Sequence, residues 1–382
     1  MRTIILHLSL IDSIGPSAVE RIMSSIGIDN LDQLYSFSES DFMYRCGLSA
    51  KQAAKIVPGL SDARVLEQEL ELIDTHKISW AYSKDDHYPE LLKTIHIPPT
   101  VLYWQGTLPG QQAIAIVGSR DANAYGRMAI DQLVPPLVQH GWAIVSGGAR
   151  GADTMAHRKA LDEGGVTVAV LGSGLLCPYP SENKGLFQEI LAEGGAVVSN
   201  FPLGMRPLPD NFPARNRVIA GMSRGCIVIQ AAAKSGARIT ADFCLSQGRE
   251  VFAVPGPIDD LLSAGCHELI SQGAKLTTNA SQVLIEFGFD ISQPEMLKKV
   301  KNNQIHPEEH LKGASRRVTP AFYAEPVDPV EAAIITACTG PCSVDELMEA
   351  TGLPLIQMSK VLFDLQIKGK LTQNMAGLWE KQ

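Results

Sequence analysis

The sequence predicts an α/β fold over residues 78–288, with a Rossmann-like, doubly wound parallel sheet. Short apolar runs of strand length alternate there with stretches of helical periodicity. The predicted strands are 113–117, 142–146, 166–171, 196–199, 226–230 and 250–254. Strands that are apolar almost throughout are typical of a sheet covered by helices on both faces. In such a sheet, ligands bind beyond the carboxyl ends of the strands.

Residues 1–65 are expected to form a small helical domain of the SAM or helix-hairpin-helix kind. Gly15-Pro16 separates two helices, and the second carries Val19, Ile22 and Met23 at helical spacing. The turn of a helix-hairpin-helix can present backbone N–H groups to a phosphate. A small helical bundle without DNA contact explains the pattern equally well.

The C-terminal part is predicted to contain a linker, residues 289–326, and a winged helix, residues 327–382. Three helices and two short strands make up the expected winged helix. Its third helix, 355–369, carries Gln357, Lys360 and Lys368 but also Asp364, so support for duplex recognition is weak. A protein-interaction module is the alternative.

Composition limits the class of protein. Hydrophobic residues make up 45% of the 382, as expected for domains with real cores. No apolar run suits a signal peptide or approaches the roughly 20 residues that span a bilayer, so we expect a cytoplasmic protein without membrane association. The seven cysteines include no C-x-x-C pair, which indicates neither a disulfide framework nor a zinc site. The formal net charge of −8 means that a nucleic-acid site would need a local basic cluster.

Small and cationic residues follow the first three predicted strands of the sheet. They are Gly118, Ser119 and Arg120, then Gly148 and Arg150, then Gly174 and Lys184. Glycines let backbone N–H groups approach an anion closely, and the cations add full charges at the same edge. This pattern predicts a phosphate-binding surface. The alternative is that the glycines only make tight turns. The dinucleotide fingerprint G-x-G-x-x-G is missing after the first strand.

A second cluster combines Phe212 with Arg215, Asn216 and Arg217. An aromatic ring beside arginines can stack a base while the cations hold the flanking phosphates. Phe212 could instead belong to the core, and Arg217 could pair with an acidic neighbour.

Catalysis is poorly supported by the sequence. His157 lies four residues after Asp153 on a predicted helix, but no nucleophile is recognisable nearby. Asp259-Asp260 is a carboxylate pair without an evident metal partner. We therefore expect a binding protein rather than an enzyme, without cofactor or metal.

The chain resembles the DprA (Smf) family of DNA-processing proteins. The resemblance covers nearly all of the chain. It is carried by 88–106, Val117-Gly118-Ser119-Arg120, 146–153, 212–219, Ser235-Gly236-Ala237-Arg238-Ile239-Thr240 and 251–256. Ala152 stands where the family usually has isoleucine.

The resemblance implies a single-stranded-DNA-binding protein that protects incoming strands during natural transformation and loads the recombinase RecA onto them. It also implies a homodimer through the Rossmann-like domain, and a DNA pocket that includes Arg120, with Lys184 and Phe212 as further pocket positions. We expect residues 1–288 to suffice for DNA binding. The main rival is a nucleoside-monophosphate phosphoribohydrolase, but its P-G-G-x-G-T-x-x-E motif is missing from the comparable segment, 232–237.

Overall fold

Two compact units, residues 1–302 and 303–382, make up the chain in a computed structural model. The structure describes residues 2–289 and, with gaps at 339, 341, 352, 354–357, 359–360, 363–364, 366–369 and 374–378, residues 329–381. The predicted linker therefore lies outside the described residues, except for Phe289. No helix among the described residues is long and apolar enough to cross a membrane.

The N-terminal region is helical, as predicted. Its elements are α1 (Arg2–Leu10), α2 (Pro16–Ile26), a 3₁₀ helix (Ile28–Ser36), α3 (Glu39–Cys46), α4 (Ala50–Ser61) and α5 (Ala63–Thr75). Ser38 and Ser49 close capping boxes at the starts of α3 and α4, which satisfies N–H groups that have no partner within the helix. Ile5, Val19 and Ile22 belong to the buried apolar core of this region. The domain boundary predicted at residue 65 falls inside α5.

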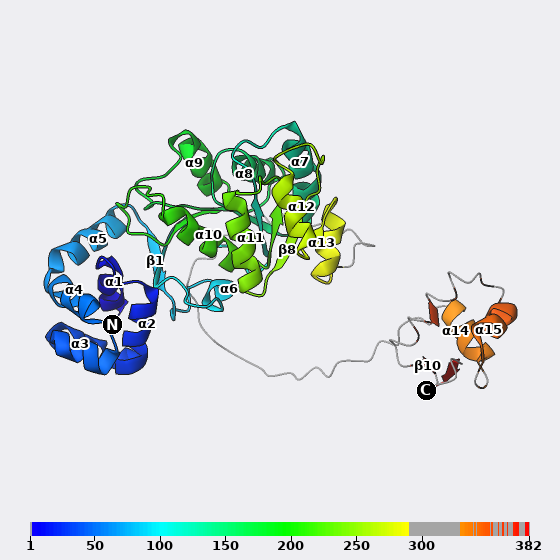
Figure 1. The fold of residues 1–382 in the computed structure, drawn as a ribbon, viewed down its shortest axis with the longest axis horizontal. Coiled ribbons are helices and arrows are strands. Elements are labelled where there is room, and N and C mark those ends of the chain that lie inside the picture. The colour runs from blue at the N-terminus through cyan, green and yellow to red at the C-terminus, as the bar shows by residue number, and fades with distance from the viewer. Residues whose placement is uncertain are drawn as a thin grey trace, which may run out of the picture. The chain divides into compact units, whose positions relative to one another are not determined.

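The central feature of the first unit is a sheet of nine strands (Figure 1). The strands are β1 (Ser79–Tyr82), β2 (Val101–Gly106), β3 (Ala113–Val117), β4 (Ala143–Ser146), β5 (Thr167–Val170), β6 (Ala196–Ser199), β7 (Gly225–Val228), β8 (Glu250–Ala253) and β9 (Lys275–Leu276). Their spatial order is β1-β2-β6-β5-β4-β3-β7-β8-β9. In this order, each pair of neighbouring strands from β6 to β9 is parallel. The predicted doubly wound parallel sheet is thus confirmed. The antiparallel edge formed by β1 and β2 was not predicted.

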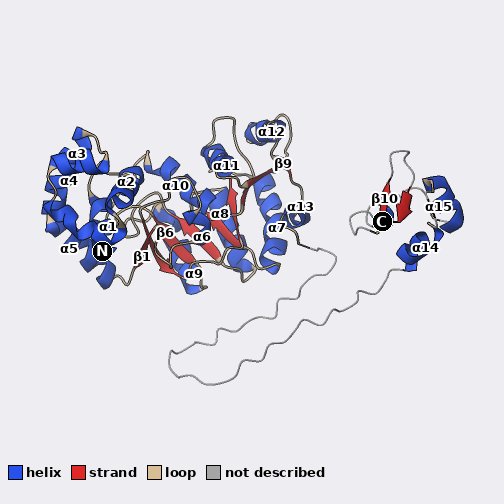
Figure 2. Ribbon diagram, turned by 90° about the horizontal axis from the view of Figure 1, so that it is seen from below, coloured by secondary structure: helices blue, strands red, loops and turns tan. Residues whose placement is uncertain are grey.

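Helices cover both faces of the sheet (Figure 2). One face carries α7 (Ala124–Gln139), α8 (Ala152–Asp162), α9 (Lys184–Ala192) and α13 (Ala280–Glu286). The other carries α6 (Glu90–Lys93), α10 (Asn211–Gly221), α11 (Gly236–Ser246) and α12 (Ala264–Ser271). Ile114 and Ile116 of β3 pack on the first face, and Ala113 and Ala115 on the second. This alternation buries each strand on both sides, which explains the continuous apolar runs.

The second unit contains α14 (Pro329–Ala337), α15 (Val344–Thr351), β10 (Leu371–Gln373) and β11 (Trp379–Lys381). β10 and β11 pair antiparallel, and Ile334, Leu347, Leu362 and Trp379 share one buried cluster. Much of the predicted third helix, including the polar residues Gln357, Lys360, Asp364 and Lys368, lies outside the described residues.

A buried carboxyl group connects α5 to the sheet domain. Glu69 is 6% exposed, and its Oε1 accepts a hydrogen bond from the Leu203 N–H at 2.8 Å. Leu6 of α1 and Leu70 of α5 pack in the same cluster as Tyr103 of β2. Burial raises the pKa of Glu69, and the Leu203 N–H opposes that shift.

This contact predicts a pH-dependent difference between the parent protein and Glu69→Gln, which keeps the acceptor oxygen but cannot ionise. Because the folded pKa lies above the usual 4.5, the folded chain holds the proton to higher pH than the unfolded chain does. The parent therefore loses stability as the pH rises from about 4.5 through the folded pKa. Denaturant unfolding should show that the free energy of unfolding of E69Q rises relative to that of the parent over this pH range. A difference between the two proteins that does not change with pH would refute the assignment. Glu69→Ala should lose about 1–3 kcal/mol, because it leaves the buried N–H without an acceptor.

Candidate nucleic-acid interface

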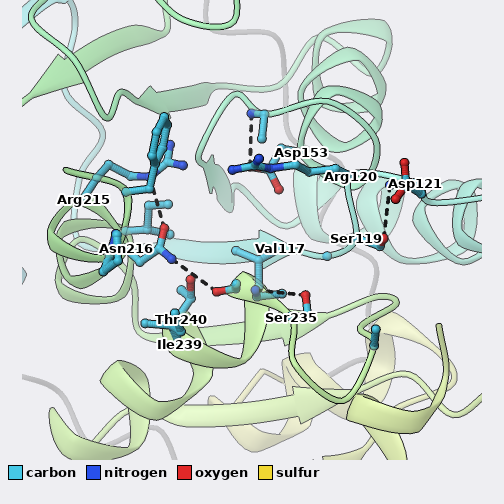
Figure 3. Close-up of a pocket in the computed structure, with 18 of the residues that line it drawn as sticks. Val117, Ser119, Arg120, Asp121, Asp153, Arg215, Asn216, Ser235, Ile239 and Thr240 are labelled. Atoms are coloured by element: carbon cyan, nitrogen blue, oxygen red, sulfur yellow. Dashed lines mark hydrogen bonds between the residues drawn. The ribbon is translucent and has the colours of Figure 1, made fainter. Parts of the chain in front are cut away.

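A cleft of about 470 Å³ opens at the carboxyl edge of the sheet (Figure 3). Its walls are residues 117–121 after β3, the start of α11, and one face of α10. β3 and β7 are neighbours whose chains continue in opposite directions across the sheet. This is the switch point of a doubly wound fold, where such folds bind their ligands. We call it the switch-point cleft.

The loop after β3 is held by main-chain bonds that leave the Arg120 side chain exposed. The Ser119 N–H donates to the carbonyl of Gln230 at 2.7 Å, and the Ser119 carbonyl accepts from the Ala152 N–H at 3.1 Å. A Cβ at Gly118 would come within 2.6 Å of the Ala152 Cβ, so the close approach of the loop to α8 requires glycine. Within the described part of the chain no carboxylate pairs with Arg120. Arg120 therefore presents a free cation to the cleft.

Phe212, the second residue of α10, lies among cations and a second aromatic ring. Its half-buried ring is 5.8 Å from that of Tyr179, edge to face. The guanidinium carbons of Arg120 and Arg215 lie 5.7 and 5.9 Å from its centre. The ring also packs over Gly172, where a Cβ would come within 2.8 Å of it. Phe212 therefore combines a structural contact with a place in the wall of the switch-point cleft, where an aromatic ring can stack a base.

Arg215 is 5% exposed and lies beneath the cleft rather than on its rim. Its guanidinium donates to the carbonyls of Gly147 and Val170, at the ends of β4 and β5. The Asp153 carboxylate accepts from the N–H groups of Gly147 at 3.1 Å and Ala149 at 3.2 Å. Burial lowers the pKa of Arg215 to about 10 and raises that of Asp153, and each charge opposes the shift of the other. We assign Arg215 a positioning role, in contrast to the phosphate contact expected from the sequence.

The next two residues of α10 face different ways. Asn216 lines the switch-point cleft, accepts from the Arg215 Nε at 3.2 Å and donates to the Gly236 carbonyl at 3.2 Å. It thereby joins α10 to the start of α11. Arg217 does not line this cleft and faces a separate one beside the helical region.

The remaining predicted residues are dispersed around the carboxyl edge. Arg150 borders a small hollow with Arg120, Tyr179 and Phe212, but its charge is paired with Glu182. Lys184 is exposed at the start of α9 and lines neither of these two cavities.

Two predicted glycines have structural explanations. A Cβ at Gly148 would meet Phe187 at 2.7 Å, and one at Gly174 would meet the Pro202 carbonyl oxygen at 2.1 Å. Neither glycine lines the switch-point cleft or the small hollow.

Two residues at the site, Ser235 and Tyr179, were not predicted from the sequence to have a role in it. Ser235 caps α11, its Oγ accepting from the Ala237 N–H at 3.2 Å, so the positive end of that helix faces the cleft. The Ser235-Gly236 pair was recognised only as a family motif, although a capping serine after a strand is a usable signal. Tyr179 follows no periodic pattern, and only the fold brings it to Phe212.

His157 and Asp153 are buried, whereas Asp259 is exposed and Asp260 is half-buried. His157 is fully buried, its Nδ1 lies 2.7 Å from the Thr167 Oγ1, and burial lowers its pKa to about 3. It is therefore neutral near pH 7 and has no access to solvent. Among the described residues no cluster of three His, Cys, Asp or Glu side chains could hold a metal ion.

Family models and curated relatives match the chain. Residues 79–288 match the family described as DNA recombination-mediator protein A, and residues 318–377 match the DprA winged helix domain. DNA processing protein DprA of Streptococcus pneumoniae is 44% identical over 207 residues, which are 54% of this chain and 73% of that protein. Protein Smf of Escherichia coli is 45% identical over 204 residues, 52% of this chain and 54% of that protein.

Two solved structures support the same assignment. The X-ray structure of DprA from Streptococcus pneumoniae matches with a TM-score of 0.65 and 34% identity, over 76% of this chain and 99% of that one. DNA processing protein A from Helicobacter pylori, whose structure is described for its single-stranded DNA binding mode, matches with a TM-score of 0.50 and 28% identity, over 55% of this chain and 95% of that one. Because the recombination-mediator model alone spans more than half of its length, this chain belongs to the DprA family of DNA-processing proteins.

Proposed function

We propose that this chain binds single-stranded DNA in the switch-point cleft, protects incoming strands and delivers them to the recombinase RecA. The observation that carries the proposal is the free Arg120 cation beside the Phe212 ring in a cleft at the switch point. The single-stranded DNA named for the Helicobacter pylori relative supports the choice of ligand. The family's description as a recombination mediator supports delivery to a recombinase.

The geometry favours single strands over duplex. A base can stack on Phe212 only if it has left its own stack, and unpaired strands allow that at little cost. Arg120 and the α11 N-terminus contact phosphates and carry no sequence information. Binding should therefore depend little on sequence. A net positive charge of the whole protein is not needed, because Arg120 and the α11 N-terminus act locally on a chain of net charge −8.

The rest of the proposal concerns assembly and chemistry. Ile258 and Leu261, in the loop between β8 and α12, are 97% and 82% exposed. Exposed apolar side chains of this kind suit a protein contact, and we assign them to a homodimer of the Rossmann-like domain. The protein acts by binding alone, without catalysis, cofactor or metal.

The first prediction of the proposed function concerns ligand type and salt. Fluorescence anisotropy should show tighter binding to single-stranded oligonucleotides of any sequence than to duplexes of equal length. The logarithm of single-strand affinity should fall with the logarithm of salt, with a slope of about −0.7 for each phosphate neutralised. Equal affinity for duplex, or affinity independent of salt, would refute the proposal.

The second prediction separates binding residues from positioning residues. Phe212→Ala should cost about 1–3 kcal/mol of binding with the salt slope nearly unchanged, since one stacked base is lost. Arg120→Ala should weaken binding and make the slope shallower, whereas Arg127→Ala, which removes an exposed arginine of α7, should do neither. Arg215→Ala should instead lower stability, by about 1–3 kcal/mol for each buried carbonyl left without a donor, because Gly147 and Val170 lose their hydrogen bonds.

Thermal melts of all four variants, alongside salt titrations, check this division. Normal binding by Arg120→Ala would show that the cleft is not the DNA site. A Phe212→Ala protein that only unfolds would place that ring in the core.

The third prediction concerns the winged helix. A fragment of residues 1–302, the first compact unit, should bind single strands like the full chain. The fragment extends past residue 288, the end expected from the sequence, because Phe289 packs against the domain core with its ring centre 5.7 Å from that of Trp142. A folded fragment, verified by circular dichroism, that binds no single strand would make the winged helix the main DNA-binding element.

A further inference from the structure

A second cleft, of about 460 Å³, lies between the helical region and the sheet domain. One wall is the end of α1 and the turn to α2, residues 9–16. The other wall is formed by 99–101, Tyr103, 200–202, Met205, Ala214 and Arg217. We call it the interdomain cleft. None of the functions above accounts for it.

Arg217 is a half-buried cation in this cleft. Within the described ranges its guanidinium has no carboxylate within ion-pair distance and no hydrogen-bond acceptor, although its carbonyl accepts from Gln247. Burial lowers the pKa of Arg217, and the nearby Tyr88 opposes the shift. An arginine nevertheless stays charged at neutral pH. A partly desolvated cation without a counter-charge favours an anionic ligand.

Other groups in the walls suit an anion. α2 begins at Gly15-Pro16, which line the cleft, and has no side-chain cap. Pro16 has no N–H and the Ala18 N–H already donates to the Gly15 carbonyl, so the N–H of the first turn that is left for a ligand is that of Ser17. The Tyr103 side chain is 1% exposed, and its hydroxyl lies beside Glu69 and Ser9 without a hydrogen bond of normal geometry to either.

The carboxylate of Asp12, which lines this cleft, repels an anion only weakly. Asp12 lines the mouth of the cleft, and its carboxylate is 2.7 Å from the Lys55 ammonium group. Both side chains are exposed enough for solvent to screen them further.

One helix connects the two clefts. Phe212, Pro213 and Asn216 of α10 line the switch-point cleft, and Ala214 and Arg217 line the interdomain cleft. Pro213 and Ala214 are exposed, so the first turn of α10 is an open surface between the two. A strand with a base on Phe212 can follow that surface toward Arg217.

We propose that the interdomain cleft is a second DNA subsite, in which Arg217 and the start of α2 bind a backbone phosphate of the strand held in the switch-point cleft. The inference rests on the proposed function and extends it, because it makes the helical region part of the DNA site. The turn at Gly15-Pro16 then has the phosphate-contacting role that the helix-hairpin-helix pattern allows.

The test uses the full chain and oligothymidylates of about 4 to about 16 nucleotides, the range of typical single-strand site sizes. Arg217→Ala should bind the shortest strands like the parent and the longest about tenfold more weakly, the loss expected for one charge-assisted contact. The salt slope for long strands should become shallower by about 0.7, since one phosphate is no longer neutralised. Arg127→Ala is the matched loss of an exposed arginine and should change neither quantity.

A second pair of variants leaves Arg217 and α10 unchanged. Ser13 is exposed in the turn at φ +67°, a conformation that Asp and Asn both tolerate. Ser13→Asp adds a negative charge at the cleft mouth and should weaken long-strand binding only, whereas Ser13→Asn, of the same size, should not. This pair decides the matter if Arg217→Ala lowers the melting temperature.

The outcomes separate this inference from the proposed function. If S13D and a folded R217A bind strands of every length like the parent while R120A does not, the subsite is refuted and the switch-point cleft stands. An equal loss at all lengths in R217A, with S13D unaffected, would show a disturbed α10 and would also refute the subsite. If the parent binds no strand of any length, the proposed function itself fails.

Discussion

The guanidinium of Arg215, buried beneath the carboxyl edge of the sheet, holds together the parts from which the DNA site is built. It bonds to carbonyls that end β4 and β5, while Asp153 bonds to the N–H groups of the loop after β4. Carbonyls at strand ends have no ladder partner, so a buried edge would be costly without such a donor. Because Arg215 belongs to α10, the same bonds fix the helix that carries Phe212.

The division of labour along α10 follows from helical geometry. Successive residues point about 100° apart, so Arg215 turns into the core, Asn216 toward α11 and Arg217 toward the helical region. Two arginines separated by one residue thus have different environments, one enclosed by main-chain acceptors and the other without an acid partner. Phe212, one turn before Arg215, lines the switch-point cleft. α10 therefore contributes side chains to the walls of both clefts.

The sequence predicts the fold better than the site. Apolar runs such as 113–117 identify parallel strands because both faces of the sheet are buried. The antiparallel pairing of β1 and β2 at the edge of the sheet was not predicted. The residue pattern of a segment does not show which other strand it pairs with. Arg120 follows a strand directly, so its place is predictable from topology alone. Arg215 looks identical to Arg217 in the sequence, and only packing distinguishes them. Gly148 and Gly174 resemble phosphate-loop glycines, but each is required by one close contact.

The central claim is that single strands are held by base stacking at the switch point. It is tested most directly by photocrosslinking the full chain to single-stranded oligonucleotides containing 5-iodouracil, which reacts with aromatic side chains lying against the base. Peptide mapping by mass spectrometry then locates the contact. The account predicts crosslinks at Phe212, in the wall of the switch-point cleft, and at Tyr179 of the adjoining small hollow, since the two rings lie 5.8 Å apart. Crosslinks confined to residues 329–381, with none on α10 or the loop that carries Tyr179, would contradict it.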